Sequence, residues 1–326
     1  MSSILVTGGA GYLGSHMVKT LVHSGRDVVV LDDLSSGHAD AVHPKAKLVT
    51  GDIRDREKVA AIVDEHRVAG VIHFAAKIQV GESMVKPRMY FQDNLVATLS
   101  LLETLLDKNV GTFILSSTAA VYGDPEYTPI DEEHPKRPVN TYGESKLFIE
   151  HALRRYHDAY GLKYAALRYF NASGADPSAG LGERHDPETH LIPLVLDAAA
   201  GKRKDIGVFG DDWQTRDGTC ERDYIHVLDL ADAHLAAFDH LTKGGASGAY
   251  NLGTGQGTTV KEIIAAVEIV SKRPVPVATK PRRDGDPAIL VASAKKAEAT
   301  FGWKAKRADL LEIVGDAWAF HQRSAG

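Results

Sequence analysis

A tyrosine and a lysine stand four residues apart in the string TYGESK, as Tyr142 and Lys146. On a helix, residues i and i+4 share a face, so a phenol and an ammonium at this spacing can meet. A phenol with a pKa of about 10 is a poor base at neutral pH, but a neighbouring cation and a helix N-terminus both favour the phenolate. The spacing therefore points to proton transfer by Tyr142, although the same pair is also common on solvated helix faces.

Two neighbouring patterns bear on this choice. Thr141 and Glu144 have capping-box spacing, which predicts a helix that starts with Tyr142 as its first helical residue. Upstream, the string FILSST ends an apolar run in Ser116 and Thr118. A hydroxyl at the carboxyl end of a strand can hydrogen-bond a substrate oxygen and share its proton with the tyrosine. The alternative is a strand-end hydroxyl that only satisfies local backbone groups.

The chain opens with a glycine-rich turn between an apolar run and a helical pattern, with glycines at positions 8, 11 and 14. Glycine permits a tight turn and a close approach of the backbone to a diphosphate, which then faces the positive helix N-terminus. Asp32 and Asp33 end the next apolar run, where a carboxylate can accept hydrogen bonds from ribose hydroxyls. Because no arginine adjoins them to bind a 2′-phosphate, this pattern predicts NAD rather than NADP. A dinucleotide site upstream also favours a catalytic role for Tyr142 and Lys146 over that of a pair on a solvated helix face.

Short apolar runs alternate with helical patterns through the first half of the chain. The runs are ILVTG, DVVVLDD, AKLVTGD, GVIHFAA, TFILSS and YAALRYF. Near-continuous apolar strands in β-α-β order are typical of a parallel sheet covered on both faces. We therefore expect an α/β fold with a Rossmann-type, doubly wound parallel sheet. The expected helix from Asn94 to Lys108 is apolar on more than one face, so it packs either on a neighbouring helix or in a subunit interface.

The pattern changes after Phe170. Residues 171–190 are rich in Gly, Pro and Asp and predict a long loop, which in a compact domain is usually functional or mobile. We place a boundary near residue 172, between a domain of residues 1–172 and a smaller α/β domain of residues 173–326. An interleaved boundary is the alternative, because DYIHVLDLADAHLAAFDHL and GAYNLG look like a helix and a strand that could return to the first sheet.

Composition excludes several functions. The chain has 326 residues, 44% of them hydrophobic, and a formal net charge of −5 with scattered Lys and Arg, which predicts neither a nucleic-acid partner nor a membrane surface. The one cysteine, Cys220, cannot form an intrachain disulfide, which fits a reducing compartment. The N-terminus runs directly into a strand without a basic segment followed by an apolar one. We therefore expect no signal peptide and a cytoplasmic location.

Tyr-x-x-x-Lys behind Gly-x-x-Gly-x-x-Gly resembles the short-chain dehydrogenase/reductase superfamily. The strings VGESM, SSTAAVYGD, LRYFNASGA, ETHLIP, RDYIHVLDLA, YNLGTG and RRDGDPA resemble, within it, the UDP-glucose 4-epimerase family, nearly from end to end. The resemblance implies NAD as cofactor, no metal, a UDP-sugar substrate, a homodimer, and exchange of UDP-glucose with UDP-galactose through a 4-keto sugar. It makes the first domain NAD-binding and the second UDP-sugar-binding.

The resemblance also implies roles for individual residues. Tyr142 is the acid/base, Lys146 its partner and a ligand of the nicotinamide ribose, and Thr118 the hydroxyl on the sugar. The positions implied for the cofactor are Gly8, Gly11, Tyr12, Leu13, Gly14, Asp32, Asp33, Asp52, Ile53, Phe74, Asn94, Ser116, Tyr142, Lys146, Tyr169 and Phe170. The positions implied for the UDP-sugar are Thr118, Tyr142, Asn171, His190, Leu191, Phe209, Arg222, Arg283, Asp286 and Leu290.

Several alternatives stay open. Thr118 replaces the serine of some members, and His190 replaces an asparagine, so His190 is either a ligand contact or a surface residue. The substrate could be a pentose or an N-acetylhexosamine. Sugar-nucleotide dehydratases and decarboxylases carry a carboxylate beside the strand-end hydroxyl, whereas this chain has Ala119 and Ala120 there, which favours epimerisation. An NAD-binding sensor would not need Tyr142, Lys146 and Thr118.

Overall fold

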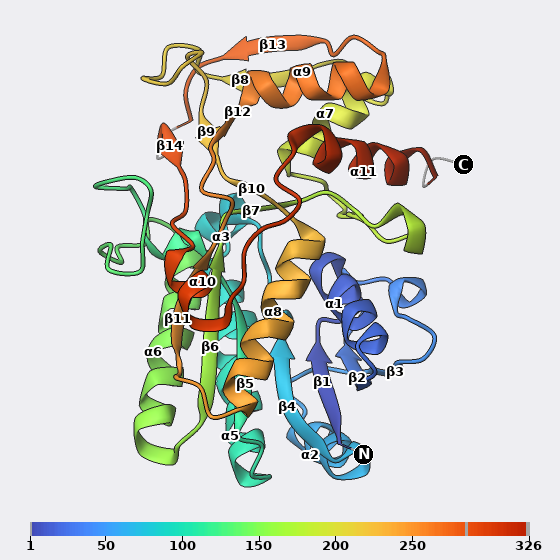
Figure 1. Cartoon of the computed structure of the whole chain (residues 1–326), viewed down its shortest axis with the longest axis vertical. Coiled ribbons are helices and arrows are strands. Elements are labelled where there is room, and N and C mark those ends of the chain that lie inside the picture. Colours follow the sequence, from blue (N-terminus) through green and yellow to red (C-terminus); the bar gives the residue numbers. More distant parts are fainter. Residues whose placement is uncertain (1, 284–285, 324–326) are drawn as a thin grey trace.

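The computed structural model describes residues 2–283 and 286–323. At its centre lies a seven-stranded parallel sheet with the order β3-β2-β1-β4-β5-β6-β11 (Figure 1). The strand order reverses between β1 and β4, which is the switch point at which such sheets bind ligands. The expected doubly wound α/β fold is confirmed. The strands are β1 (Ser3–Thr7), β2 (Asp27–Asp32), β3 (Lys47–Thr50), β4 (Val68–His73), β5 (Thr112–Thr118), β6 (Lys163–Tyr169) and β11 (Gly248–Leu252).

Helices cover both faces of this sheet, which is why its strands are apolar on both sides. Alternate residues of β1 show the division, because Leu5 packs in one core and Val6 in the other. The Val6 core is closed by α1 (Tyr12–His23) and α8 (Val227–Thr242). The Leu5 core is closed by α2 (Arg56–His66), α5 (Ala97–Asp107) and α6 (Thr141–Tyr160).

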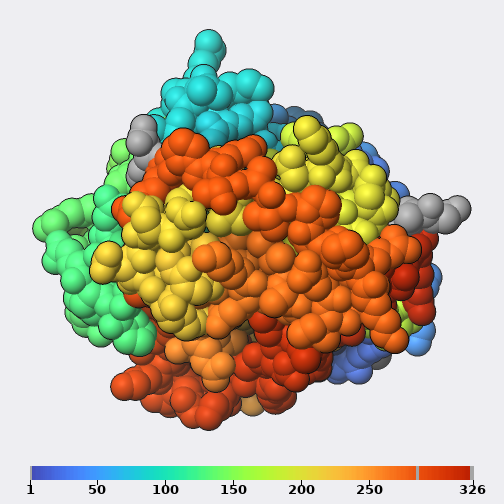
Figure 2. Space-filling model, turned by 90° about the horizontal axis from the view of Figure 1, so that it is seen from above, coloured from blue at the N-terminus to red at the C-terminus, as the bar shows by residue number. Residues whose placement is uncertain are grey.

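A smaller layer lies over the carboxyl ends of the strands. Figure 2 shows that segments from the C-terminal half form most of this face. Its helices α7 (Leu191–Ala199), α9 (Val260–Ser271) and α11 (Leu310–Arg323) share a separate apolar core. Its strands are short: β7 (Asn171–Ser173), β8 (Ile206–Phe209), β9 (Glu221–Arg222), β10 (Tyr224–His226), β12 (Thr258–Thr259), β13 (Val277–Lys280) and β14 (Ile289–Leu290). The remaining elements are η1 (Ala39–Ala41), α3 (Val80–Val85), α4 (Pro87–Tyr90), η2 (Phe91–Val96), η3 (Ala119–Val121), η4 (Pro177–Ala179) and α10 (Lys295–Phe301).

The chain returns to the central sheet after it has entered this upper layer. Strand β11 pairs in parallel with β6, with Gly248 opposite Ala165, and α8 packs beside α1. The central sheet therefore contains residues from both sides of position 172.

Three local expectations need correction. Helix α6 begins at Thr141 rather than Tyr142, because the side chain of Asn140 accepts the hydrogen bond from the Gly143 amide at 2.8 Å and caps the helix. The helix expected from Asn94 continues a helical run that starts at Pro87 and passes through the π-helical turn η2. The predicted loop 171–190 contains β7 and η4, so part of it is regular.

Candidate active site

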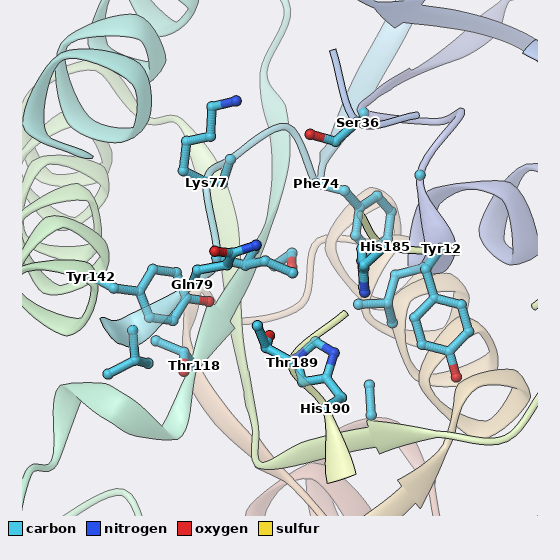
Figure 3. A pocket seen from close by; sticks show the side chains of 18 of the residues that line it. Tyr12, Ser36, Phe74, Lys77, Gln79, Thr118, Tyr142, His185, Thr189 and His190 are labelled. Atoms are coloured by element: carbon cyan, nitrogen blue, oxygen red, sulfur yellow. The ribbon is translucent and has the colours of Figure 1, made fainter. Parts of the chain in front are cut away.

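A large cavity opens where the carboxyl ends of the central strands meet the upper layer. Its volume is about 890 Å³, at the upper end of the roughly 300–1,000 Å³ typical of ligand pockets, so an elongated ligand and a second molecule can share it. It is lined by the glycine-rich turn, the ends of β2, β5 and β6, residues 182–187 and 189–193, and parts of β9 and β14. Figure 3 shows Tyr142 and Thr118 at one end of the cavity and Tyr12 and His185 at the other.

The glycine-rich turn has the shape that a diphosphate needs. Gly8 has a φ of +71°, which favours glycine. A Cβ on Gly14 would lie 2.0 Å from the carbonyl oxygen of Gly8, so helix α1 could not approach the turn as closely. A Cβ on Gly11 would meet only that same oxygen, at 3.4 Å, so this backbone is open to the cavity that Gly11 lines. The turn and the first amides of α1 therefore fit a dinucleotide.

The acidic residues after β2 and β3 also lie in the cavity. Asp32 is buried, and its carboxylate accepts hydrogen bonds from the amides of Ala10 at 2.9 Å and Leu34 at 2.8 Å. A carboxylate has about four lone-pair sites, so Asp32 keeps capacity for a ribose hydroxyl. Asp52 and its neighbour Ile53 line the same end, as does Asp33.

One arginine at this end escaped the sequence-based reasoning. Arg54 lines the cavity, and its Nε donates to Asp52 at 2.9 Å while its Nη1 donates to Asp93 at 3.1 Å. Two carboxylates thus already pair with Arg54, which leaves its guanidinium less available for a 2′-phosphate. This arrangement still favours NAD over NADP.

Tyr142 and Lys146 both face the cavity from the first turns of α6. The Lys146 ammonium is buried and donates a hydrogen bond to the Ser116 carbonyl oxygen at 2.9 Å. Thr118 ends β5 and accepts a hydrogen bond from the Ala120 amide at 3.1 Å, which orients its hydroxyl. Ser116 shares a hydrogen bond with the Tyr169 hydroxyl at 2.5 Å. The strand end and the helix start thus bring the three predicted catalytic residues to one end of the cavity.

The electrostatics of the chain alone do not favour a phenolate at Tyr142. Burial raises the pKa of Tyr142 to about 12, and a hydrogen bond with Thr118 only partly opposes this. Burial also lowers the pKa of Lys146 to about 8, against the attraction of Glu150. A buried phenol without a bound cation keeps its proton. Lys146 and α6 are therefore insufficient by themselves, and a further positive charge in the cavity is needed to favour the phenolate.

A buried network behind α6 was missed by the sequence-based reasoning. Glu150, one turn after Lys146, accepts hydrogen bonds from Ser117 at 2.6 Å and from Arg168 Nε at 2.9 Å. Arg168 also donates to the Tyr122 hydroxyl at 2.8 Å. The network joins α6 to β5 and β6, so it fixes the distance between the helix that holds Lys146 and the strand that holds Thr118. A Glu on the Lys146 side of α6, together with an Arg inside an apolar strand, is the signal that could have revealed it.

Most of the predicted UDP-sugar positions line the other part of the cavity. They are Thr118, Tyr142, Asn171, His190, Leu191, Arg222, Asp286 and Leu290. Arg222 is mostly buried, and its guanidinium lies 3.6 Å from Asp286. Leu290 lines the cavity and also packs beside Ala119 and Phe170. Asp284 and Gly285, within the string RRDGDPA, lie outside the described residues.

Three predicted positions lie elsewhere. Asn94 is fully buried, and its amide bonds to the backbone of Lys77 and to Ser145, so it supports the cavity wall instead of lining it. The Phe209 ring and the Arg283 guanidinium are not among the described groups that line the cavity. The Cζ atom of Arg283 lies 3.7 Å from the centroid of the Phe209 ring, so the two side chains stack on each other.

His190 belongs to a cluster of four polar side chains on the loop before α7. Its Nδ1 contacts Glu183 and lies 3.5 Å from Glu188, while the Nδ1 of His185 lies 3.0 Å from Glu183. Burial opposes a charge on His190, but the two carboxylates outweigh it and raise its pKa to about 10. The same balance raises the pKa of His185 to about 9. His190 is therefore part of a charge-paired cluster at the cavity wall.

Comparisons with known proteins agree with this geometry. The UDP-glucose 4-epimerase of Halalkalibacterium halodurans is 49% identical over 98% of this chain and 96% of that protein. A crystal structure of a UDP-glucose 4-epimerase matches with a TM-score of 0.98 and 48% identity, covering 100% of this chain and 99% of the other. The Brucella ovis UDP-glucose 4-epimerase in complex with NAD matches with a TM-score of 0.95 and 46% identity, covering 98% of each chain. The family model that matches residues 4–253 describes the NAD dependent epimerase/dehydratase family, and the chain belongs to that family.

Proposed function

We propose that the protein interconverts UDP-glucose and UDP-galactose by inverting carbon 4 of the sugar, with NAD held along the glycine-rich turn. The observation that carries the proposal is the meeting of Tyr142, Lys146 and Thr118 at the end of a cavity whose other parts fit a dinucleotide and a nucleotide sugar. The central sheet, including β11, would hold the cofactor, and the upper layer would hold the UDP-sugar. The relatives named above match nearly the whole chain, and their names state this activity.

In the proposed reaction, bound NAD supplies a reversible hydride acceptor. Tyr142 removes the proton from the 4-hydroxyl of the sugar as the hydride leaves carbon 4, and a 4-keto sugar forms. The sugar then turns over in the cavity. Tyr142 returns the proton after the hydride has come back to the opposite face, so the tyrosine ends in its original protonation state.

Two residues support that tyrosine. The Lys146 ammonium stabilises the phenolate and is held in place by the Ser116 carbonyl. Thr118 places its hydroxyl at the sugar oxygen and exchanges a hydrogen bond with Tyr142. The two residues that follow, Ala119 and Ala120, line the same end of the cavity with methyl groups. Methyl groups cannot move the additional protons that elimination of water requires, which favours epimerisation over dehydration.

A direct assay tests this proposal. The purified chain, with no cofactor added, is incubated with UDP-galactose, and UDP-glucose is measured by chromatography. We expect conversion without added NAD because the reaction regenerates its cofactor, which can stay bound. Absence of conversion with NAD also supplied, or activity of the stripped chain with NADP alone, would contradict the proposal.

We expect Leu290 to limit the size of the group at carbon 2 of the sugar. Leu290 lines the cavity and is branched and apolar, so it offers no hydrogen bond to an acetamide. One misfitting apolar group typically changes kcat/KM by roughly tenfold to two-hundredfold. UDP-N-acetylgalactosamine should therefore be used less efficiently than UDP-galactose by about that factor, and Leu290→Ala should narrow the gap. Comparable kcat/KM for both sugars in the wild type, or no gain in the variant, would show that Leu290 is not the gate.

We also propose a homodimer formed through α5, α6 and the turn η2. Phe148 on α6 is 50% exposed and Val96 in η2 is 43% exposed, and large exposed apolar side chains that cluster mark interaction surfaces. Light scattering at micromolar concentration should show a dimer, and Phe148→Glu should give a monomer. Ile269→Glu is the matched control, because Ile269 is also a large apolar side chain and is 63% exposed, but it lies on α9. A monomeric wild type would refute the proposal.

Among the described residues, no helix is both long enough and apolar enough to cross a membrane.

A further inference from the structure

We infer that Glu183, His185, Glu188 and His190 form a binding site for one transition-metal dication of the Zn²⁺ class. Each of these side chains offers one ligand atom, and the four atoms all lie within 4.8 Å of one another. Nitrogen and carboxylate oxygen are the ligands that Zn²⁺ accepts beside thiolate. Neither the proposed epimerisation nor its cofactor uses such an ion, so this site is additional to the proposed function.

The separations within the cluster suit a tetrahedral ion. Metal–ligand bonds of about 2.0–2.1 Å place neighbouring ligand atoms of a tetrahedron about 3.3–3.4 Å apart. The Nδ1 atom of His185 lies 3.0 Å from Glu183 and 3.7 Å from Glu188. The Nδ1 atom of His190 lies 3.5 Å from Glu188 and closer to Glu183. These separations are close to the tetrahedral value.

The charge of the cluster also matches. Two carboxylates and two neutral imidazoles carry a total charge of −2, which one dication neutralises. Without an ion, the two carboxylates contact the imidazoles directly. Each imidazole then presents its Nδ1 to a carboxylate, as the contacts show. A metal would take the place of the protons at these two nitrogen atoms.

The backbone around the cluster is already held in place. The carboxylate of Glu188 accepts hydrogen bonds from the amides of Thr189 at 2.7 Å and His190 at 2.8 Å, which orients it. Arg184, between two of the ligands, donates to Asp40 at 2.8 Å and 3.0 Å. The Tyr12 ring stands edge-on to the ring of His185 at 6.4 Å. Such supporting contacts orient metal ligands and increase metal affinity.

Four protein ligands leave no open position, so the ion would be structural and not a Lewis acid for the reaction. Glu183, His185 and His190 also line the large cavity. One ion would therefore fix the loop 183–190 as the wall of that cavity. Because two histidines and two glutamates alternate within eight residues as E-x-H-x-x-E-x-H, the loop needs no other segment to complete the site.

The test uses the full chain, purified without a histidine tag, treated with chelator, dialysed and titrated with Co²⁺. Tetrahedral Co²⁺ absorbs strongly in the visible range, whereas hydrated octahedral Co²⁺ absorbs weakly. We expect a tetrahedral spectrum that saturates at one equivalent, and displacement of the Co²⁺ by one equivalent of Zn²⁺. Glu188→Gln should weaken Co²⁺ binding at least tenfold. The matched control His66→Gln removes a histidine from the His66–Glu65 pair on α2 and should bind like the wild type.

Two results would overturn the inference. One is a wild-type spectrum that remains that of hydrated Co²⁺ at one equivalent, which would leave the cluster as a set of ion pairs. This spectrum is measured on the wild-type chain, so it tests the metal site even if Glu188→Gln folds poorly. The other is equal binding of Co²⁺ by the folded Glu188→Gln variant and the wild type, which would place the ion elsewhere. Both readouts are independent of epimerase activity, so they can fail while the proposed function stands.

Discussion

Tyr142→Phe should lower kcat by at least about a hundredfold, the low end of what a positioned acid or base contributes. The change removes one oxygen atom from a side chain at the cavity end and leaves the ring that fills the space. Because the proton transfer exists only in the reaction, kcat and kcat/KM should fall together, with little change in KM. Initial rates with UDP-galactose measure the effect.

The matched control for this change is Tyr160→Phe. Tyr160 lies on the same helix, α6, and is 67% exposed, so its hydroxyl faces solvent far from the cavity. We expect the control to keep wild-type turnover. A Tyr142→Phe chain that is folded, carries cofactor and turns over at a normal rate would remove Tyr142 from the proposed chemistry.

Gly14→Ala should lower cofactor retention and turnover by roughly a hundredfold, the effect that a misplacement of about 1 Å can have on an active site. The new Cβ would lie 2.0 Å from the carbonyl oxygen of Gly8 and 2.7 Å from the Cα of Gly9. Both are backbone atoms, which cannot rotate away as a side chain can. Helix α1 must therefore move from the turn, and its first amides move with it.

Gly315→Ala is the matched control for Gly14→Ala, because both glycines lie within helices. A Cβ on Gly315 would meet nothing within 4 Å, and alanine in place of glycine in a helix stabilises it by roughly 0.5–1 kcal/mol. Bound NAD, measured in the supernatant after heat denaturation, and the melting temperature compare the two variants. Equal NAD content in Gly14→Ala and the wild type would show that the turn tolerates the shift.

The sequence was informative where a local pattern decides the structure. The apolar strands, the helices between them and the glycines at positions 8, 11 and 14 depend on neighbours within a few residues, and they lie as expected. The start of α6 was wrong by one residue because Asn140 and Thr141 are adjacent and both residue types can cap a helix. Only the folded backbone decides which side chain reaches the free amide.

Contacts between distant segments could not be predicted in the same way. Ser117, Glu150 and Arg168 meet because two strands and a helix pack together. A Glu on α6 and an Arg in an apolar strand each indicate a buried charge, but their spacing does not show that they pair with each other. The pKa of Tyr142 follows from burial, which a motif does not report. Phe209 and Arg283 match family positions, yet they stack on each other and are not among the described residues that line the cavity. The variants described above test the roles of the predicted site residues.

The return of β11 to the central sheet has a consequence for synthesis on the ribosome. Strand β6 cannot gain its outer neighbour until residue 252 has emerged, and the face that α8 covers cannot close until residue 242 has emerged. Chains grow at about 5–20 residues per second, so the nascent N-terminal segment spends seconds with an exposed apolar sheet face and an unpaired strand edge. Such surfaces are where nascent chains aggregate, so a chaperone that shields apolar segments should matter most while residues 170–252 are being made.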